Sequence, residues 1–287
     1  MTLFKKKKQL RTSLAEDQAH ILSEDLSFAA QEAYKSLRTN VMFSLTNEGC
    51  KVIIVTSPGP GEAKSTTAVN MALSFAQNRS RVLLVDCDLR MPTAAQKLQI
   101  DDTPGLSDLL VGQARLNEVV HVAAGGLFMI PAGTIPPNPA ELLGSRQMTQ
   151  VLESLRKNFD YVILDTPPIL TVSDAVVLSP MADGVVLVGR QFISTNKEFR
   201  DAISQLEFVN AHIIGFVLTD VESEKKHGDK YGKYSSYGYG YASAGKKSSA
   251  AQKSAAGNAK TDPAVRARSS ESGTRTLRRE APVSRRD

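Results

Sequence analysis

The fold of this 287-residue chain is decided by the stretch Lys51-Val-Ile-Ile-Val-Thr-Ser-Pro-Gly-Pro-Gly-Glu-Ala-Lys-Ser-Thr66. Residues 51–56 form a continuous apolar run, which is typical of a strand buried on both faces of a parallel sheet. A loop rich in Pro and Gly follows, and a helical pattern covers 65–77. A loop between a strand and a helix N-terminus turns its backbone N–H groups toward a phosphate. The stretch therefore predicts a strand, a phosphate-binding loop and a helix in succession.

The same alternation continues along the chain. Further apolar runs bounded by turn residues predict strands over 81–86, 127–131, 161–165, 184–189 and 213–218. Helical patterns lie between these runs, over 139–157, 173–181 and 196–209. Alternating strands and helices predict an α/β fold with a doubly wound, mostly parallel sheet and right-handed crossovers. Ligands of such sheets bind beyond the carboxyl ends of the strands.

Composition divides the chain into four parts. Residues 1–24 include the run Lys5–Lys8 and are expected to be a flexible basic N-terminus. Residues 25–224 hold the apolar runs and form the predicted folded domain, and a flexible tyrosine-rich segment follows over 225–242. Residues 243–287 contain eleven Lys/Arg, four Asp/Glu and almost no large apolar residue. Such a basic tail cannot bury enough apolar area to offset chain entropy, so we expect it to be disordered.

Several classes of protein are disfavoured by the composition. No apolar stretch approaches the roughly 18 residues that a spanning helix needs, and no apolar segment follows the N-terminal lysines as in a secretory signal. We therefore expect a cytoplasmic protein, whose basic ends either attract anionic lipid or only keep the termini soluble. Cys50 and Cys87 show no disulfide or metal-ligand spacing and are expected to be buried thiols. No nucleic acid is expected as a partner, because the tail places no aromatic residue to stack on bases.

The loop and the start of the following helix supply the candidate nucleotide-binding residues. Lys64 would reach the β- and γ-phosphates, and the Ser65 hydroxyl would ligate Mg²⁺. Glycine normally precedes this lysine, but the chain has Ala63, whose Cβ would crowd the phosphate and resist the torsions that glycine allows. We expect either a small local shift or a weaker affinity for nucleotide. The residues assigned to the nucleotide are Gly59, Pro60, Gly61, Glu62, Ala63, Lys64, Ser65 and Thr66.

Two other predicted strands end in carboxylates. One ends in Asp86-Cys-Asp88-Leu-Arg90, and carboxylates two residues apart leave a strand end on the same side. Near a triphosphate these carboxylates would hold Mg²⁺ through water or accept a proton from an attacking hydroxyl. Arg90 would pair with a carboxylate or a phosphate. The run over 161–165 ends in Asp165 before Thr-Pro-Pro, a Walker B form that places a carboxylate near the metal.

A cluster of tyrosines follows the predicted domain. Five of the seven tyrosines lie in residues 231–241, Tyr-Gly-Lys-Tyr-Ser-Ser-Tyr-Gly-Tyr-Gly-Tyr. The segment has no Leu, Ile or Val, so it can form neither a core strand nor the apolar face of a helix. A ribbon of phenols beside a nucleotide-binding domain is expected to be a substrate. The candidate phosphorylation sites are Tyr231, Tyr234, Tyr237, Tyr239 and Tyr241.

These motifs together resemble the bacterial tyrosine kinases of capsular and exopolysaccharide biosynthesis, in the Gram-positive form whose kinase is a separate chain from its membrane activator. The resemblance covers about residues 32–241 and includes the stretch Pro131-Ala-Gly-Thr-Ile-Pro-Pro-Asn-Pro-Ala-Glu-Leu-Leu143. It implies a P-loop NTPase fold of the deviant Walker type shared with partition ATPases. It also implies an ATP- and Mg²⁺-dependent protein-tyrosine kinase whose catalytic domain is residues 25–224.

The resemblance also implies roles for single residues. Asp86 would receive the proton of the tyrosine hydroxyl. The implied catalytic residues are Lys64, Asp86, Asp88, Arg90 and Asp165. The implied Mg²⁺ ligands are Ser65, Asp86, Asp88 and Asp165.

A ring of subunits is a further implication. The family carries a Glu-x-x-Arg-x-x-Arg helix motif that contacts the next subunit, and Glu32, Lys35 and Arg38 match it with lysine in the middle. Lysine cannot make the planar bidentate contact of arginine, so a weaker interface is expected. The resemblance implies an octameric ring with autophosphorylation in trans. The other implied partners are a transmembrane activator that recruits the kinase to the inner face of the plasma membrane, a phosphatase and exogenous protein substrates.

Two alternatives to an active kinase in capsule or exopolysaccharide synthesis and export stay open. A partition or division-site ATPase usually has a lysine five residues before the Walker lysine, where this chain has Gly59. A weakly active, kinase-like scaffold for a membrane polysaccharide co-polymerase would be consistent with Ala63.

Overall fold

The structure is a computed structural model in which residues 19–221 are described. The expectations for the basic N-terminus up to residue 18, for the five clustered tyrosines and for the basic tail lie outside the described residues. They stay predictions.

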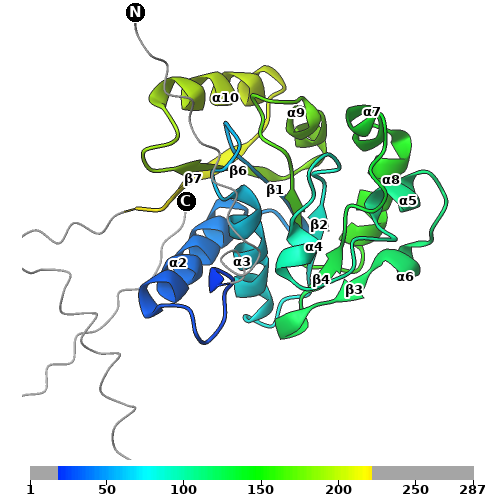
Figure 1. Cartoon of the computed structure of the whole chain (residues 1–287), viewed down its shortest axis with the longest axis horizontal. Coiled ribbons are helices and arrows are strands. Elements are labelled where there is room, and N and C mark those ends of the chain that lie inside the picture. Colours follow the sequence, from blue (N-terminus) through cyan, green and yellow to red (C-terminus); the bar gives the residue numbers. More distant parts are fainter. Residues whose placement is uncertain (1–18, 222–287) are drawn as a thin grey trace, which may run out of the picture. The chain divides into compact units, whose positions relative to one another are not determined.

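Seven strands form one sheet in the order β3-β4-β2-β5-β1-β6-β7 (Figure 1). Every neighbouring pair is parallel except β3 and β4. The strands are β1 (Lys51–Thr56), β2 (Val82–Asp86), β3 (His121–Val122), β4 (Phe128–Ile130), β5 (Tyr161–Asp165), β6 (Gly184–Arg190) and β7 (Ile213–Thr219). Each apolar run that predicted a strand is one of these strands. The predicted α/β fold with a mostly parallel, doubly wound sheet is therefore confirmed.

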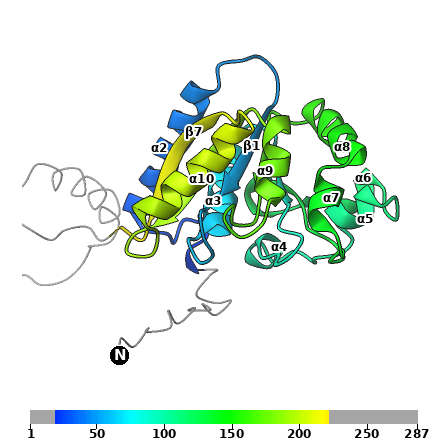
Figure 2. The same ribbon diagram turned by 90° about the horizontal axis from the view of Figure 1, so that it is seen from above.

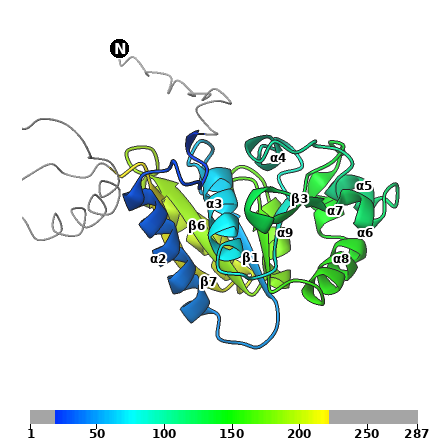
Figure 3. The same ribbon diagram turned by 90° about the horizontal axis from the view of Figure 1, so that it is seen from below.

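Helices cover both faces of the sheet. Figure 3 shows α2 and α3 in front of the strands, and Figure 2 shows α9 and α10 on the opposite side. The helices are α2 (Phe28–Ser44), α3 (Lys64–Ala76), α4 (Ala94–Lys97), α5 (Leu106–Leu110), α6 (Leu116–Val119), α7 (Pro139–Leu143), α8 (Arg146–Arg156), α9 (Asp174–Leu178) and α10 (Asn196–Phe208). Short 3₁₀ turns lie at Ala124–Gly126 and Ser179–Met181.

The core consists of two apolar clusters, one on each face of the sheet. Successive side chains of a strand point to opposite faces, so Val52 and Ile54 belong to the cluster that contains side chains of α8, α9 and α10. Ile53 and Val55 belong to the cluster that contains side chains of α2 and α3. All four side chains are fully buried. Burial on both faces explains why the strand sequences are continuous apolar runs rather than alternating ones.

One predicted helix is divided in two. The pattern over 139–157 predicts a single helix, but α7 ends at Leu143 and α8 begins at Arg146. A Cβ on Gly144 would lie 2.8 Å from Val177 Cγ1 of α9, so glycine is needed for this close approach. Ser145 then caps α8 by accepting the N–H of Met148 at 3.2 Å. The spacing of apolar residues in the sequence predicts neither the approach of Gly144 to α9 nor the cap at Ser145.

Gly105, immediately before α5, offers a test of the packing. An added Cβ would lie 2.3 Å from Gly133 N and 2.4 Å from Pro131 O, and backbone atoms cannot move aside singly. We expect Gly105→Ala to lower the free energy of unfolding by about 3 kcal/mol in urea denaturation. Gly215→Ala in β7 is the control, because its added Cβ would meet nothing within 4 Å. An equal loss in both variants would contradict the expected clash.

Candidate active site

The sheet order brings three sequence motifs to one edge. Strand β5 lies between β2 and β1, and all three strands are parallel, so their carboxyl ends meet. Asp86 and Asp165, the last residues of β2 and β5, are direct partners in the register. On the other side of β5, Val55 of β1 is paired with Asp165. The phosphate loop leaves β1 one residue later, and so it starts beside both carboxylates.

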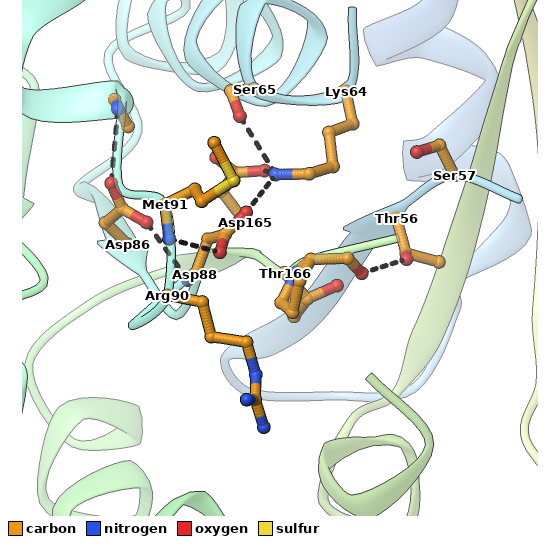
Figure 4. A network of polar contacts seen from close by, with 12 residues as sticks. Thr56, Ser57, Lys64, Ser65, Asp86, Asp88, Arg90, Met91, Asp165 and Thr166 are labelled. Atoms are coloured by element: carbon orange, nitrogen blue, oxygen red, sulfur yellow. Dashed lines mark hydrogen bonds and ion pairs between the residues drawn. The ribbon is translucent and has the colours of Figure 1, made fainter. Parts of the chain in front are cut away.

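The ammonium group of Lys64 is the centre of a polar network at this edge (Figure 4). Its Nζ lies 2.9 Å from Asp88 Oδ2, 3.4 Å from Asp165 Oδ1 and 3.1 Å from Ser65 Oγ. Burial alone would lower the pKa of Lys64, but the charges of Asp165 and Asp88 outweigh it and raise this pKa above its ordinary value. Lys64 is therefore a firmly held cation among carboxylates.

Asp86 is enclosed by backbone donors and fully buried. Its Oδ1 accepts the N–H of Asp88 and its Oδ2 accepts the N–H of Ala94, both at 3.1 Å. Burial, together with repulsion from Asp165, raises the pKa of Asp86 to about 8. Two backbone donors thus hold both oxygens of Asp86 in place at the edge where the phosphate loop begins.

Asp165 has the property expected of a cation ligand. It is fully buried, and burial raises its pKa although Lys64 opposes the shift. Its Oδ2 has no hydrogen-bond partner among the described residues, which is costly for a buried oxygen. This free carboxylate oxygen, with the Ser65 hydroxyl bound to the same lysine, is a hard-oxygen donor set that fits Mg²⁺. Within residues 19–221 no three acidic, His or Cys side chains form a metal cage, and Mg²⁺ usually shares one or two carboxylates with substrate phosphates.

Arg90 points away from Lys64 in Figure 4. Its Nε and Nη2 donate to the two carboxylate oxygens of Asp174 at 2.9 and 3.0 Å, a bidentate pair. The expected pairing with a carboxylate is thus present, but the partner is the buried first residue of α9. This pair fixes the segment after β2 against α9. Asp174 was not predicted, because an acidic residue at a helix start is common and carries no distinct signal.

Two buried threonines join the ends of β1 and β5, and the motifs did not indicate them. Thr56 Oγ1 donates to the carbonyl oxygen of Pro167 at 2.9 Å, a bond drawn in Figure 4. Thr166 Oγ1 donates to the carbonyl oxygen of Val55 at 3.1 Å. Threonine is ordinary in and beside strands, so neither residue stands out in the sequence.

The phosphate loop departs from the glycine pattern in its sequence, although its backbone keeps a conformation that favours glycine. Ala63, directly before α3, has φ 64° and ψ 26°, the left-handed region that favours glycine. Pro58 occupies the place of the first glycine in the pattern G-x-x-x-x-G-K-[ST]. Pro60 and Gly61 at the loop tip are exposed, and Thr66 lies in the first turn of α3. Ala63 therefore holds a strained conformation next to Lys64.

Ala63→Gly is expected to raise the free energy of unfolding by about 1 kcal/mol, because relief of the left-handed strain exceeds the entropy that glycine adds to the unfolded chain. We also expect tighter binding of ATP, since the Cβ beside the phosphate loop is removed. The control is Arg79→Gly, which relieves a similar φ of 62° beyond α3. It should gain stability without a change in ATP affinity. Equal or weaker ATP binding by Ala63→Gly in a calorimetric titration would contradict this expectation.

The three residues of the expected ring motif lie on α2. Lys35 Nζ lies 2.7 Å from Glu32 Oε1, and both side chains are about half exposed, at 48% and 46%. Arg38 instead turns to its own chain and donates to the carbonyl oxygen of Ser74 in α3 at 2.6 Å. Arg38 therefore also joins α2 to α3.

The structure also describes the two cysteines and the length and apolarity of the helices. Cys50 and Cys87 are buried free thiols, as predicted, and burial raises the pKa of Cys50 to about 11. Among the residues that the structure describes, none of the helices is both long and apolar enough to cross a bilayer.

A protein family, curated proteins and a solved structure are similar to this chain. The model of the AAA domain family matches residues 50–207. The chain is 37% identical to the tyrosine-protein kinase YwqD of Bacillus subtilis over 209 residues, which are 72% of this chain and 85% of YwqD. It is 38% identical to the protein named "Putative tyrosine-protein kinase EpsB" of Ralstonia solanacearum over 74% of this chain, but it spans only 29% of EpsB. The solved kinase domain of the Escherichia coli tyrosine kinase ETK is similar with a TM-score of 0.64 and 33% identity, covering 70% of this chain and 80% of that one.

Proposed function

Because this chain belongs to the bacterial tyrosine kinases of the P-loop NTPase superfamily, we propose that it is an ATP- and Mg²⁺-dependent protein-tyrosine kinase. The observation that supports this most is the position of Lys64. Its ammonium group lies at the start of the helix after the phosphate loop, within 3.4 Å of Asp88 and Asp165. A cation and carboxylates at this place are what phosphoryl transfer requires.

The reaction would move the γ-phosphoryl group of ATP to a tyrosine oxygen. The phenol oxygen forms the new bond to phosphorus, the bond to the β-phosphate oxygen breaks, and ADP leaves. Asp86, whose carboxylate is held in place by two backbone N–H groups, would take the phenol proton. Lys64 would neutralise charge on the phosphates, Ser65 and Asp165 would hold Mg²⁺, and Asp86 and Asp88 would hold it through water. Bound Mg²⁺ supplies further charge neutralisation on the phosphates.

Arg90 takes a positioning role in this proposal. Its guanidinium group is bound to both oxygens of Asp174, so it holds the Asp86–Asp88 segment rather than the phosphate. The backbone N–H groups of Gly61, Glu62 and Ala63 would supply donors for the phosphates.

The substrate and the assembly are proposals from the family. The acceptors are the clustered tyrosines, Tyr231, Tyr234, Tyr237, Tyr239 and Tyr241. Each is phosphorylated by a neighbouring subunit of a ring in which Glu32, Lys35 and Arg38 of α2 take part. The kinase acts at the inner face of the plasma membrane, to which a transmembrane activator recruits it. It regulates the synthesis and export of capsule or exopolysaccharide, with a phosphatase as the opposing enzyme and other proteins as further substrates.

One observation supports a second candidate function. The left-handed backbone of Ala63 in the phosphate loop would favour a weakly active, kinase-like scaffold for the membrane co-polymerase. A partition-type ATPase is favoured by no comparable feature, because Gly59 stands in place of the lysine that such proteins usually have.

An assay for phosphotyrosine distinguishes these functions. The full chain is incubated with ATP and Mg²⁺, alone and with the cytoplasmic segment of a transmembrane activator, and phosphotyrosine is detected with an antibody. We expect a signal that is lost when the five clustered tyrosines are replaced by phenylalanine. ATP hydrolysis without any phosphotyrosine would support an ATPase, and ATP binding without either reaction would support a scaffold.

A further inference from the structure

The side chain of Glu62 turns inward from an exposed loop. It is only 2% exposed, although Pro60 and Gly61 before it are exposed. Its Oε2 accepts the backbone N–H of Gly59 at 3.0 Å, and its Oε1 accepts the hydroxyl of Ser194. A buried carboxylate is costly unless its oxygens are paired, and here each oxygen has a donor. The contact to Gly59 closes the phosphate loop on itself.

The partner of Glu62 belongs to the turn that follows β6. Ser194 Oγ accepts the N–H of Arg190 at 2.7 Å while it donates to Glu62. Arg190 in turn donates from Nη1 to the carbonyl oxygen of Gly61 at 3.3 Å. The turn and the phosphate loop are therefore in contact through the side chains of Ser194 and Glu62. It also contains Phe192 with φ 64°, a conformation that a bulky residue holds only where its surroundings determine it.

The same contacts reach the end of β7. Thr219 Oγ1 donates to the carbonyl oxygen of Glu62 at 3.2 Å. Arg190 is paired with Asp220 through Nε at 3.0 Å and Nη2 at 2.9 Å. The phosphate loop is thus bound to the ends of two strands beside it, and the bonds converge on Glu62 and Arg190.

Attraction between the Glu62 carboxylate and the phosphates of a nucleotide cannot explain why the loop contains this residue. A carboxylate in a loop that receives phosphates is electrostatically unfavourable, since like charges repel. Glu62 must therefore contribute through geometry. Phosphate loops bind through the direction of their backbone N–H groups, and the Glu62 carboxylate fixes the backbone between residues 59 and 62. Preorganised donors cost no reorganisation when the ligand arrives.

We infer that Glu62 is a positioning residue of the phosphate loop, which it holds, with Ser194, in the shape that binds a nucleoside triphosphate. This inference rests on the proposed function, because it assumes that ATP binds at this loop. It predicts that removing the carboxylate weakens nucleotide binding although the loop loses a negative charge. If only the charge of Glu62 affected binding, removal of the carboxylate would strengthen nucleotide binding.

The test compares three variants with the wild-type chain in a titration with Mg²⁺ and ATP. Glu62→Ala removes both acceptors and is expected to weaken ATP binding by about tenfold. Glu62→Gln keeps an oxygen for Gly59 N–H and a group that can bond the Ser194 hydroxyl, so it should restore most of the affinity. Ser194→Ala removes one anchor, leaves the loop sequence intact and is expected to weaken binding less than Glu62→Ala does. Ser194→Ala also allows the inference to be tested if Glu62→Ala fails to fold.

A matched control exists in the same chain. Glu118 Oε2 accepts the N–H of Arg115, three residues before it, at 2.7 Å, the same sequence separation as between Glu62 and Gly59. Glu118→Ala should leave the ATP affinity unchanged. Wild-type chain that binds ATP, with Glu62→Ala binding equally well or better, would overturn this inference alone. Wild-type chain that binds no ATP would overturn the proposed function and the inference with it.

Discussion

Lys64→Met is expected to lower the rate of tyrosine phosphorylation by about a thousandfold. Methionine keeps the apolar body of the side chain but removes the charge beside Asp88 and Asp165. Catalysis of phosphoryl transfer consists mainly of positioning and charge neutralisation, so loss of this cation removes a large part of it. The rate is measured by transfer of labelled phosphate from ATP to the chain.

Lys197→Met is the control for this prediction. Lys197 is 80% exposed and is paired with Asp201 of α10 rather than with a residue assigned to the nucleotide. Its replacement removes the same charge and is expected to leave the rate unchanged. Comparable losses in both variants would show that total charge, rather than the place of Lys64, determines the rate.

The Lys64 substitution should also destabilise the protein without nucleotide. Lys64 is in contact with Asp88 and Asp165, which are nearly or fully buried. Removing one partner of a buried ion pair typically costs about 3–5 kcal/mol. Protonation of the remaining carboxyls reduces this cost, so we expect a loss of about 2 kcal/mol. Urea denaturation at neutral pH measures it.

The sequence was sufficient for the elements that place these groups. The apolar runs over 51–56 and 161–165 predicted buried parallel strands, and a parallel sheet collects the ends of its strands at one edge. That rule placed Lys64, Asp86 and Asp165 at the same edge. It did not specify the register, in which Asp86 and Asp165 are direct partners.

The parts that the sequence did not predict depend on contacts between distant segments. Arg90 and Asp174 are 84 positions apart, and Glu62 and Ser194 are 132 apart. No local pattern relates such residues, since hydrophobic periodicity reports only the face of a single element. The short helices α4, α5 and α6 were missed for a related reason, because four or five residues are too few to show a helical period.

Ala63 departs from the glycine pattern in sequence and is strained in structure. The sequence identified it as a departure from the glycine pattern, and the structure gives the departure a physical form, a φ of 64°. A buried glutamate one residue earlier fixes the same loop. The loop thus combines backbone strain at one residue with side-chain bonds that oppose its relaxation.

Asp165→Asn is expected to change activity and stability in opposite directions. Asparagine keeps the shape of the side chain but removes a charged ligand for Mg²⁺, so the phosphorylation rate should fall by about a hundredfold or more. The nucleotide-free protein, in contrast, should gain about 1 kcal/mol. The reason is that Asp165 Oδ2 is buried without a partner among the described residues, beside the carboxylates of Asp86 and Asp88.

The pH dependence identifies the source of this gain. Burial raises the pKa of Asp165 in the folded protein, so the folded state binds more protons than the unfolded state between the unfolded pKa of about 3.9 and this higher folded pKa. An ionised Asp165 therefore opposes folding at neutral pH, and this contribution disappears as pH falls below that value. The advantage of Asp165→Asn in urea denaturation should be present at pH 7 and absent near pH 3. Asp201→Asn is the control, because the Asp201 side chain is 48% exposed on α10, and it should show neither effect. A gain that persists at low pH would mean that packing, rather than the buried charge, distinguishes the variant.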